Sequence, residues 1–114
     1  MMESKTTWLF SAFLALVLMG VSLNYAFAGD KELAAEGRLV ALEWCSRCHN
    51  IEPGGPFKQY PPSFSAIAIY RSSNQIFSRI TVQPLHSNMP RLAYILTPDN
   101  INSLVKYIES LEPN

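Results

Sequence analysis

Five consecutive residues, Cys45-Ser46-Arg47-Cys48-His49, constrain this chain more than any other feature of its sequence. They contain both cysteines of the chain. On a helical turn, positions i, i+3 and i+4 share one face, so two thiols and an imidazole here can address the same bound group. The Cys-x-x-Cys-His spacing is the attachment signature of c-type haem. We therefore expect one covalently attached haem c with its iron, joined by thioether bonds to Cys45 and Cys48 and ligated by His49.

Other chemistries also use two cysteines at this spacing. A thiol-disulfide oxidoreductase places its Cys-x-x-Cys pair on a β-α-β pattern, which this sequence lacks. A zinc site would need the motif and His86 together as its four ligands, at a poor spacing for that purpose. A disulfide between Cys45 and Cys48 would close a very small loop and contribute little stability. Haem attachment is therefore favoured, with thiol-disulfide chemistry as the alternative.

The first quarter of the chain has the layout of a secretory signal peptide. Residues 8–23 are almost entirely apolar, Lys5 precedes them, and Ala26-Phe27-Ala28 places small residues where a signal peptidase cleaves. This layout predicts a signal peptide at 1–28, a single domain at 29–114 and export to the periplasm. The apolar run is short for a membrane span, so an uncleaved anchor facing the periplasm is the alternative.

The balance of charges argues against nucleic-acid binding. Nine Lys and Arg residues are matched by nine Asp and Glu residues, and no basic cluster occurs. Nucleic-acid binding needs a clustered basic surface, so it is not expected. Balanced charge also predicts weak electrostatic steering toward partners and a modest dependence of association on salt.

The spacing of apolar residues predicts an all-α domain with long, structured loops. The stretch 52–62, with four prolines and two glycines, and the stretch 90–96 are expected to be irregular. Each predicted helix has a capping residue or a proline at an end. The predicted helices are 31–44 capped by Asp30, a short one from Phe64 to Tyr70 capped by Ser63, a third between the caps at 72–74 and Pro84, and a last one starting at Thr97-Pro98 and ending before Pro113.

Met89 is the candidate for the second axial ligand of the iron. It is the one methionine outside the predicted signal peptide, and it lies in the polar stretch 86–90. A thioether opposite a histidine raises the reduction potential, because soft sulfur favours reduced iron. His86 is the rival ligand, but one loop cannot easily present both side chains to the same iron. We expect His49 and Met89 to be the axial ligands.

The motif and Met89-Pro90 together resemble the class I, monohaem His/Met cytochromes c of the small bacterial type, over essentially residues 31–111. The resemblance implies that the N- and C-terminal helices cross, with short middle helices and long loops around a covalently bound haem. The family has a glycine eight residues before its first cysteine, at the helix crossing, and Gly37 matches it. Leu104 and Tyr107 are its expected partners on the last helix.

The resemblance also implies a proline carbonyl that accepts the Nδ1 proton of His49, fixes its tautomer and raises its basicity as a ligand. Pro62 is preferred over Pro56 because the family's proline leads directly into a short helix. No clear set of residues for the haem propionates stands out, and the candidates are Arg71, Arg79, Tyr60 and Tyr70. The candidate apolar wall around the haem consists of Leu39, Leu42, Phe64, Ile67, Phe77, Ile80, Leu92 and Ile95.

An iron with both axial positions filled has no open site for a substrate. The resemblance therefore implies an electron carrier, not an enzyme. Its partners would be a quinol-oxidising complex or dehydrogenase as donor and an oxidase or reductase as acceptor, in small and short-lived contacts. A cytochrome subunit of a multi-component dehydrogenase or respiratory complex is the main alternative. An enzyme or sensor with a labile Met89 is a third interpretation.

Overall fold

The computed structural model describes residues 29–55, 60–82 and 89–113. The chain divides into two compact units, 1–31 and 32–114. In the first unit only residues 29–31 are described, and they are helical. The predicted signal peptide lies outside the described residues, as do Pro56 and His86. None of the described helices combines the length and the apolar character needed to cross a membrane.

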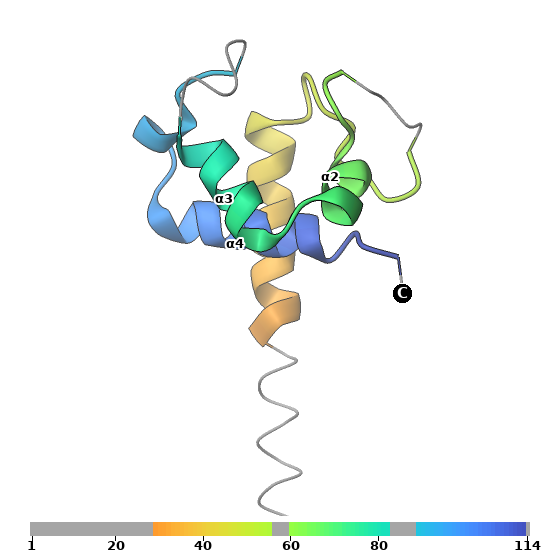
Figure 1. Cartoon of the computed structure of the whole chain (residues 1–114). Helices are drawn as coiled ribbons and strands as arrows, with labels where there is room; N and C mark the ends of the chain where they lie inside the picture. The colour runs from red at the N-terminus through yellow and green to blue at the C-terminus, as the bar shows by residue number, and fades with distance from the viewer. Residues whose placement is uncertain (1–28, 56–59, 83–88, 114) are drawn as a thin grey trace, which may run out of the picture. The chain divides into compact units, whose positions relative to one another are not determined.

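The described part of the second unit is helical and contains no strand, which confirms the all-α prediction. The helix that includes residues 29–31 continues to residue 44. The elements that follow it are α2 (Phe64–Tyr70), α3 (Ser73–Thr81), the 3₁₀ helix η1 (Leu92–Tyr94) and α4 (Pro98–Glu109) (Figure 1).

Three of the predicted helix starts are confirmed, and the fourth is wrong. The side chain of Ser63 accepts the backbone N–H of Ala66, while Ser72 and Thr97 each form a reciprocal capping box. Asp30, in contrast, is itself helical. An N-cap residue has extended backbone geometry, so Asp30 does not cap this helix.

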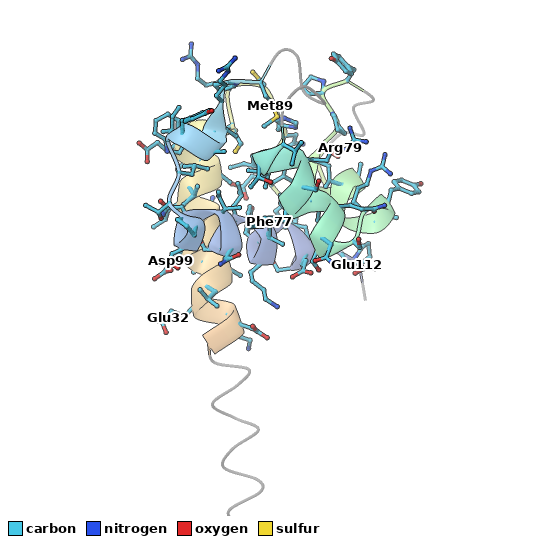
Figure 2. All side chains as sticks on the ribbon, turned by 60° about the vertical axis from the view of Figure 1, so that its left-hand side comes forward. Glu32, Phe77, Arg79, Met89, Asp99 and Glu112 are labelled. Atoms are coloured by element: carbon cyan, nitrogen blue, oxygen red, sulfur yellow. The ribbon has the colours of Figure 1, made fainter. Side chains whose placement is uncertain are left out.

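The first helix and α4 cross at Gly37 (Figures 1 and 2). A Cβ atom on Gly37 would lie 1.9 Å from the carbonyl oxygen of Ser103 and 2.8 Å from the Cβ of Tyr107. Only glycine allows the two backbones to approach so closely. The predicted partner Tyr107 is correct, but Leu104 is not among the nearest neighbours. Leu104 is rotated by roughly 100° around α4 from Ser103, and it lines a cavity instead.

A second set of contacts joins the segment after the cysteine motif to these helices. The hydroxyl of buried Tyr107 donates to the carbonyl of Ile51 at 2.8 Å. Burial and the neighbouring Glu52 carboxylate raise the pKa of Tyr107, so the phenol remains a donor at neutral pH. Arg38 pairs with Glu52 at 2.5 Å, but both side chains are about half exposed, so solvent screens the pair and it adds little stability. The hydrogen bond from the buried Tyr107 hydroxyl therefore contributes more to this contact than the exposed ion pair does.

Replacing Gly37 by alanine is expected to destabilise the protein by about 2 kcal/mol or more. Alanine gains roughly 1 kcal/mol in helix propensity, but its methyl group would overlap a backbone carbonyl that cannot move without displacing α4. Denaturant unfolding followed by circular dichroism measures the loss. Glu36→Ala, on the exposed neighbouring position, is the control and should change the free energy of unfolding by less than about 0.5 kcal/mol. Equal stability of the Gly37→Ala variant and the wild type would contradict the close crossing.

Candidate functional site

A cavity of about 550 Å³ lies inside the helical unit. Its volume is within the roughly 300–1,000 Å³ typical of small-molecule and cofactor sites. Its lining is mostly apolar and is drawn from the first helix, the motif, α2, α3, η1 and α4. Residues far apart in the sequence therefore contribute to one space, which is partly open to solvent.

The cysteine motif forms one wall of this cavity. The backbone N–H of Cys45 donates to Ala41 at 2.9 Å, and that of His49 donates to Cys45 at 2.9 Å, so the helical bonding pattern continues into the motif. The backbone N–H of Cys48 donates to the carbonyl of Cys45 at 3.1 Å, which forms a tighter, three-residue turn. Cys45, Cys48 and His49 all line the cavity. The turn thus brings two sulfur atoms and one imidazole to the same space.

The imidazole of His49 is buried and held by the chain segment before α2. Its Nδ1 lies 2.7 Å from the carbonyl oxygen of Pro62. A carbonyl can only accept, so Nδ1 carries the proton and Nε2 keeps its lone pair for a ligand. The backbone N–H of Phe64 donates to Asn50 at 2.9 Å, which holds the Pro62 segment beside the residues after the motif. Pro62 is the proline that the resemblance favoured, whereas Pro56 lies outside the described residues.

Met89 lines the same cavity as His49. Its side chain is half-buried and packs against the core, and the exposed Pro90 follows it at the cavity wall. Figure 2 shows Met89 and Arg79 at the same end of the unit, away from Glu32. The thioether and the imidazole are therefore presented to one space by separate parts of the chain. The rival ligand His86 lies outside the described residues.

The candidate apolar wall is half correct. Phe64, Ile67, Ile80 and Leu92 line the cavity. Leu39, Leu42, Phe77 and Ile95 do not, and they are 64%, 50%, 42% and 47% exposed. The first helix buries residues 37, 41 and 45, spaced four apart, so Leu39 and Leu42 project from other faces. On α3 the buried pair is Ile76 and Ile80, which likewise leaves Phe77 outside.

Several lining residues were not predicted from the sequence. Ile76, Leu104 and Ile108 all line the cavity from α3 and α4. The sequence did indicate that Leu104 and Ile108 are buried, because they are spaced four apart on the apolar stripe of the last helix. The spacing does not indicate whether this stripe packs against another helix or lines a cavity. Of the four candidates for binding the propionates, Arg71, Arg79 and Tyr60 line the cavity and Tyr70 does not.

The state of the thiols bears on the alternative chemistry. Both cysteines are free, with Cys45 buried and Cys48 exposed. Burial, with a smaller effect of Cys48, raises the pKa of Cys45 to about 11, so this thiol is protonated at neutral pH. Thiol-disulfide enzymes depend on a thiolate whose pKa is lowered, so Cys45 lacks the character of such a nucleophile. No group of three or more metal-binding side chains occurs within residues 29–55, 60–82 and 89–113.

The chain matches no protein-family model, no curated protein and no solved structure in comparisons with each. The site is therefore characterised by its own residues. It combines two cysteine sulfurs, a histidine fixed through Nδ1, a methionine thioether and an apolar enclosure.

Proposed function

We propose that this chain is a small monohaem cytochrome c of class I, which carries one electron between redox partners in the periplasm. The observation that carries the proposal is the shared cavity. Cys45, Cys48, His49 and Met89 line one mostly apolar space of about 550 Å³. In this proposal Cys45 and Cys48 form the thioether bonds, and His49 and Met89 bind the iron. When bound, the haem supplies the one-electron chemistry.

The protein's part is to fix the ligands and tune their chemistry. The Pro62 carbonyl orients the imidazole of His49 through its Nδ1–H and increases the basicity of Nε2. Met89 presents soft sulfur, which favours reduced iron and raises the reduction potential. His49 is held through Pro62 and Met89 packs against the core, so both side chains would be positioned to hold the iron.

The apolar lining has a distinct role. Side chains such as Phe64, Leu92 and Leu104, each no more than 3% exposed, would cover the haem with apolar groups and reduce its contact with water. If His49 and Met89 both bound the iron, no ligand position would remain for a substrate, which would suit a carrier and not an enzyme. The donor and acceptor are proposed to be a quinol-oxidising complex or dehydrogenase and an oxidase or reductase.

Visible spectroscopy of the exported protein tests the proposal. The full chain is expressed in a bacterial host with a cytochrome c maturation system, purified, and examined in oxidised and reduced forms. We expect a pyridine haemochrome typical of thioether-linked haem, one haem per chain by intact mass, and pigment that resists acid-acetone extraction. Carbon monoxide should not bind rapidly to the reduced form. A colourless protein, or an extractable pigment, would overturn the proposal, and rapid binding of carbon monoxide would favour an enzyme or sensor.

A further inference from the structure

We infer that Arg71 and Arg79 bind the two propionate carboxylates of the haem. This inference rests on the proposed function. It separates the four sequence candidates into two that bind carboxylate and two that do not, and it names the edge of the cavity that holds the polar end of the cofactor.

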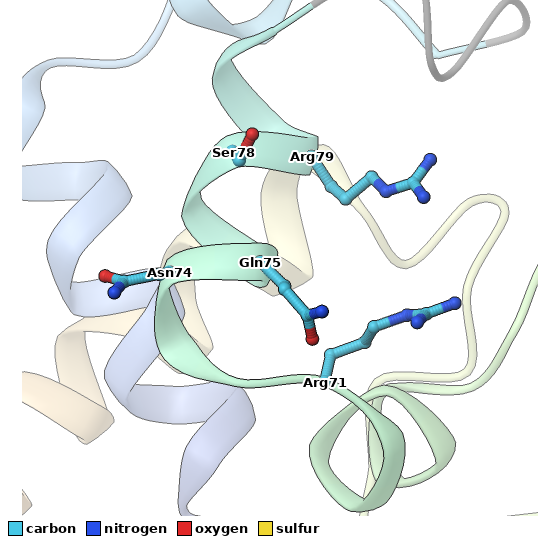
Figure 3. Close-up of a pocket in the computed structure, with 5 residues that line it drawn as sticks. All are labelled: Arg71, Asn74, Gln75, Ser78 and Arg79. Atoms are coloured by element: carbon cyan, nitrogen blue, oxygen red, sulfur yellow. The ribbon is translucent and has the colours of Figure 1, made fainter.

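The two arginines stand at the boundary between an apolar space and a polar one. Arg71 follows α2 as its C-cap residue, and Arg79 lies in α3. Both line the large cavity, and both also line a smaller hollow of about 220 Å³. Figure 3 shows their side chains extending in the same direction, with Gln75 between them. The other residues of the smaller hollow, Asn74 and Ser78, are polar as well.

The charges around this boundary favour an anionic ligand. No Asp or Glu among the described residues lines either hollow. Within the same described residues, neither guanidinium makes an ion pair or a hydrogen bond, in contrast to Arg38, which pairs with Glu52. Two neighbouring positive charges therefore line a mostly apolar cavity, with no negative partner among residues 29–55, 60–82 and 89–113. Arginine is the side chain best suited to carboxylate because its planar fork binds both oxygens.

The shape of the ligand follows from the lining. A porphyrin has an apolar body, two vinyl groups that become thioethers, and two carboxylates on a different edge. The cavity has the matching parts: an apolar interior, two cysteine sulfurs from the motif, and two arginines from the α2–α3 region. The vinyl edge is thus assigned to Cys45 and Cys48, and the propionate edge to Arg71 and Arg79. Tyr70 does not line the cavity, and Tyr60 carries no positive charge and does not line the smaller hollow, so neither is assigned a carboxylate.

The test uses the holoprotein with haem labelled at its propionate carboxyl carbons with ¹³C, which separates these groups from protein carboxylates. The variants are Arg71→Gln, Arg79→Gln and the double variant. Arg91→Gln is the control, because Arg91 is exposed and follows Pro90 but does not line the cavity. Redox-difference infrared spectra report the labelled carboxylate bands, and a potentiometric titration gives the reduction potential.

We expect each single variant to shift the labelled carboxylate bands and the double variant to shift them most, with no shift in Arg91→Gln. The reduction potential should fall more in the double variant than in the control, because two positive charges near oxidised iron are lost. Haem content should remain one per chain in all of them. If the glutamine variants fail to accumulate, Arg71→Lys and Arg79→Lys keep the charge and lose the fork, and they should shift the same bands.

Two outcomes would overturn the inference while leaving the proposed function intact. In one, the labelled bands of the double variant match those of the wild type. In the other, added inorganic phosphate shifts the potential of the wild type but not of the double variant, which would show that the arginines bind a free anion. If the wild-type chain carries no haem, the proposed function fails together with the inference, so the two failures are distinguishable.

Discussion

Replacing both Cys45 and Cys48 by alanine is expected to leave almost no folded protein in the periplasm. Without thioether bonds the haem is not retained, and the cavity of about 550 Å³ is left empty. Its mostly apolar lining would then face water instead of the haem, so the chain would lose much of its buried apolar surface. Small domains have only roughly 5–15 kcal/mol of total stability, so a loss of this kind leaves little folded protein. Immunoblotting of periplasmic extracts measures the accumulated protein.

The same double variant distinguishes the proposed cytochrome from a thiol-disulfide oxidoreductase. In an oxidoreductase the two thiols carry the activity and contribute little to stability, because a Cys-x-x-Cys disulfide closes a very small loop. The folded protein would then accumulate without them. Ser46→Ala is the matched control within the motif, because the exposed Ser46 hydroxyl bonds only to the carbonyl of Leu42. It should accumulate as the wild type does. Wild-type accumulation of a colourless, folded Cys45→Ala/Cys48→Ala variant would contradict the proposed role of the haem in the core.

Local sequence rules predicted the helices well because their signals are local. Ser72 and Gln75 form their capping box within four residues, and Thr97 does the same with Asn100. The apolar positions of α4 are one continuous stripe. The predictions of buried side chains failed where burial depends on a segment far away in the sequence. Leu39 and Leu42 are apolar residues on a helix with apolar spacing, and only the position of the crossing at Gly37 shows that they face outward.

The candidate site divides in the same way. The motif and Met89 could be named from the sequence because their chemistry depends on residue type and spacing. The carbonyl that holds His49 needed more than the local pattern: Pro62 and Pro56 both follow the motif within one proline-rich stretch, and only the resemblance favoured Pro62. Arg71 and Tyr70 are adjacent in the sequence, and only the folded chain shows that one lines the cavity and the other does not. The supporting residues of a site are set by the packing of helices, which no short pattern records.

Met89→Ala is expected to keep the covalent haem and to change its ligation. The oxidised protein should lose the weak sulfur-to-iron charge-transfer band at the red end of the visible spectrum, because no sulfur ligand remains. The reduction potential should fall by on the order of 0.2 V, a fraction of the roughly 0.8 V range that axial ligands set. Visible spectra and a potentiometric titration measure both changes. His86→Ala is the control and should leave the band and the potential unchanged.

The reduced Met89→Ala variant should also bind carbon monoxide rapidly. Met89 is half-buried at the cavity, so under the proposed ligation its truncation would free one position on the iron, while His49 would stay fixed by Pro62. In the wild type that position would be occupied by Met89, and binding should be slow. If the sulfur band persists without Met89, the ligand is another group. If the wild type shows no sulfur band, and His86→Ala rather than Met89→Ala lowers the potential and allows carbon monoxide to bind, then His86 is the ligand.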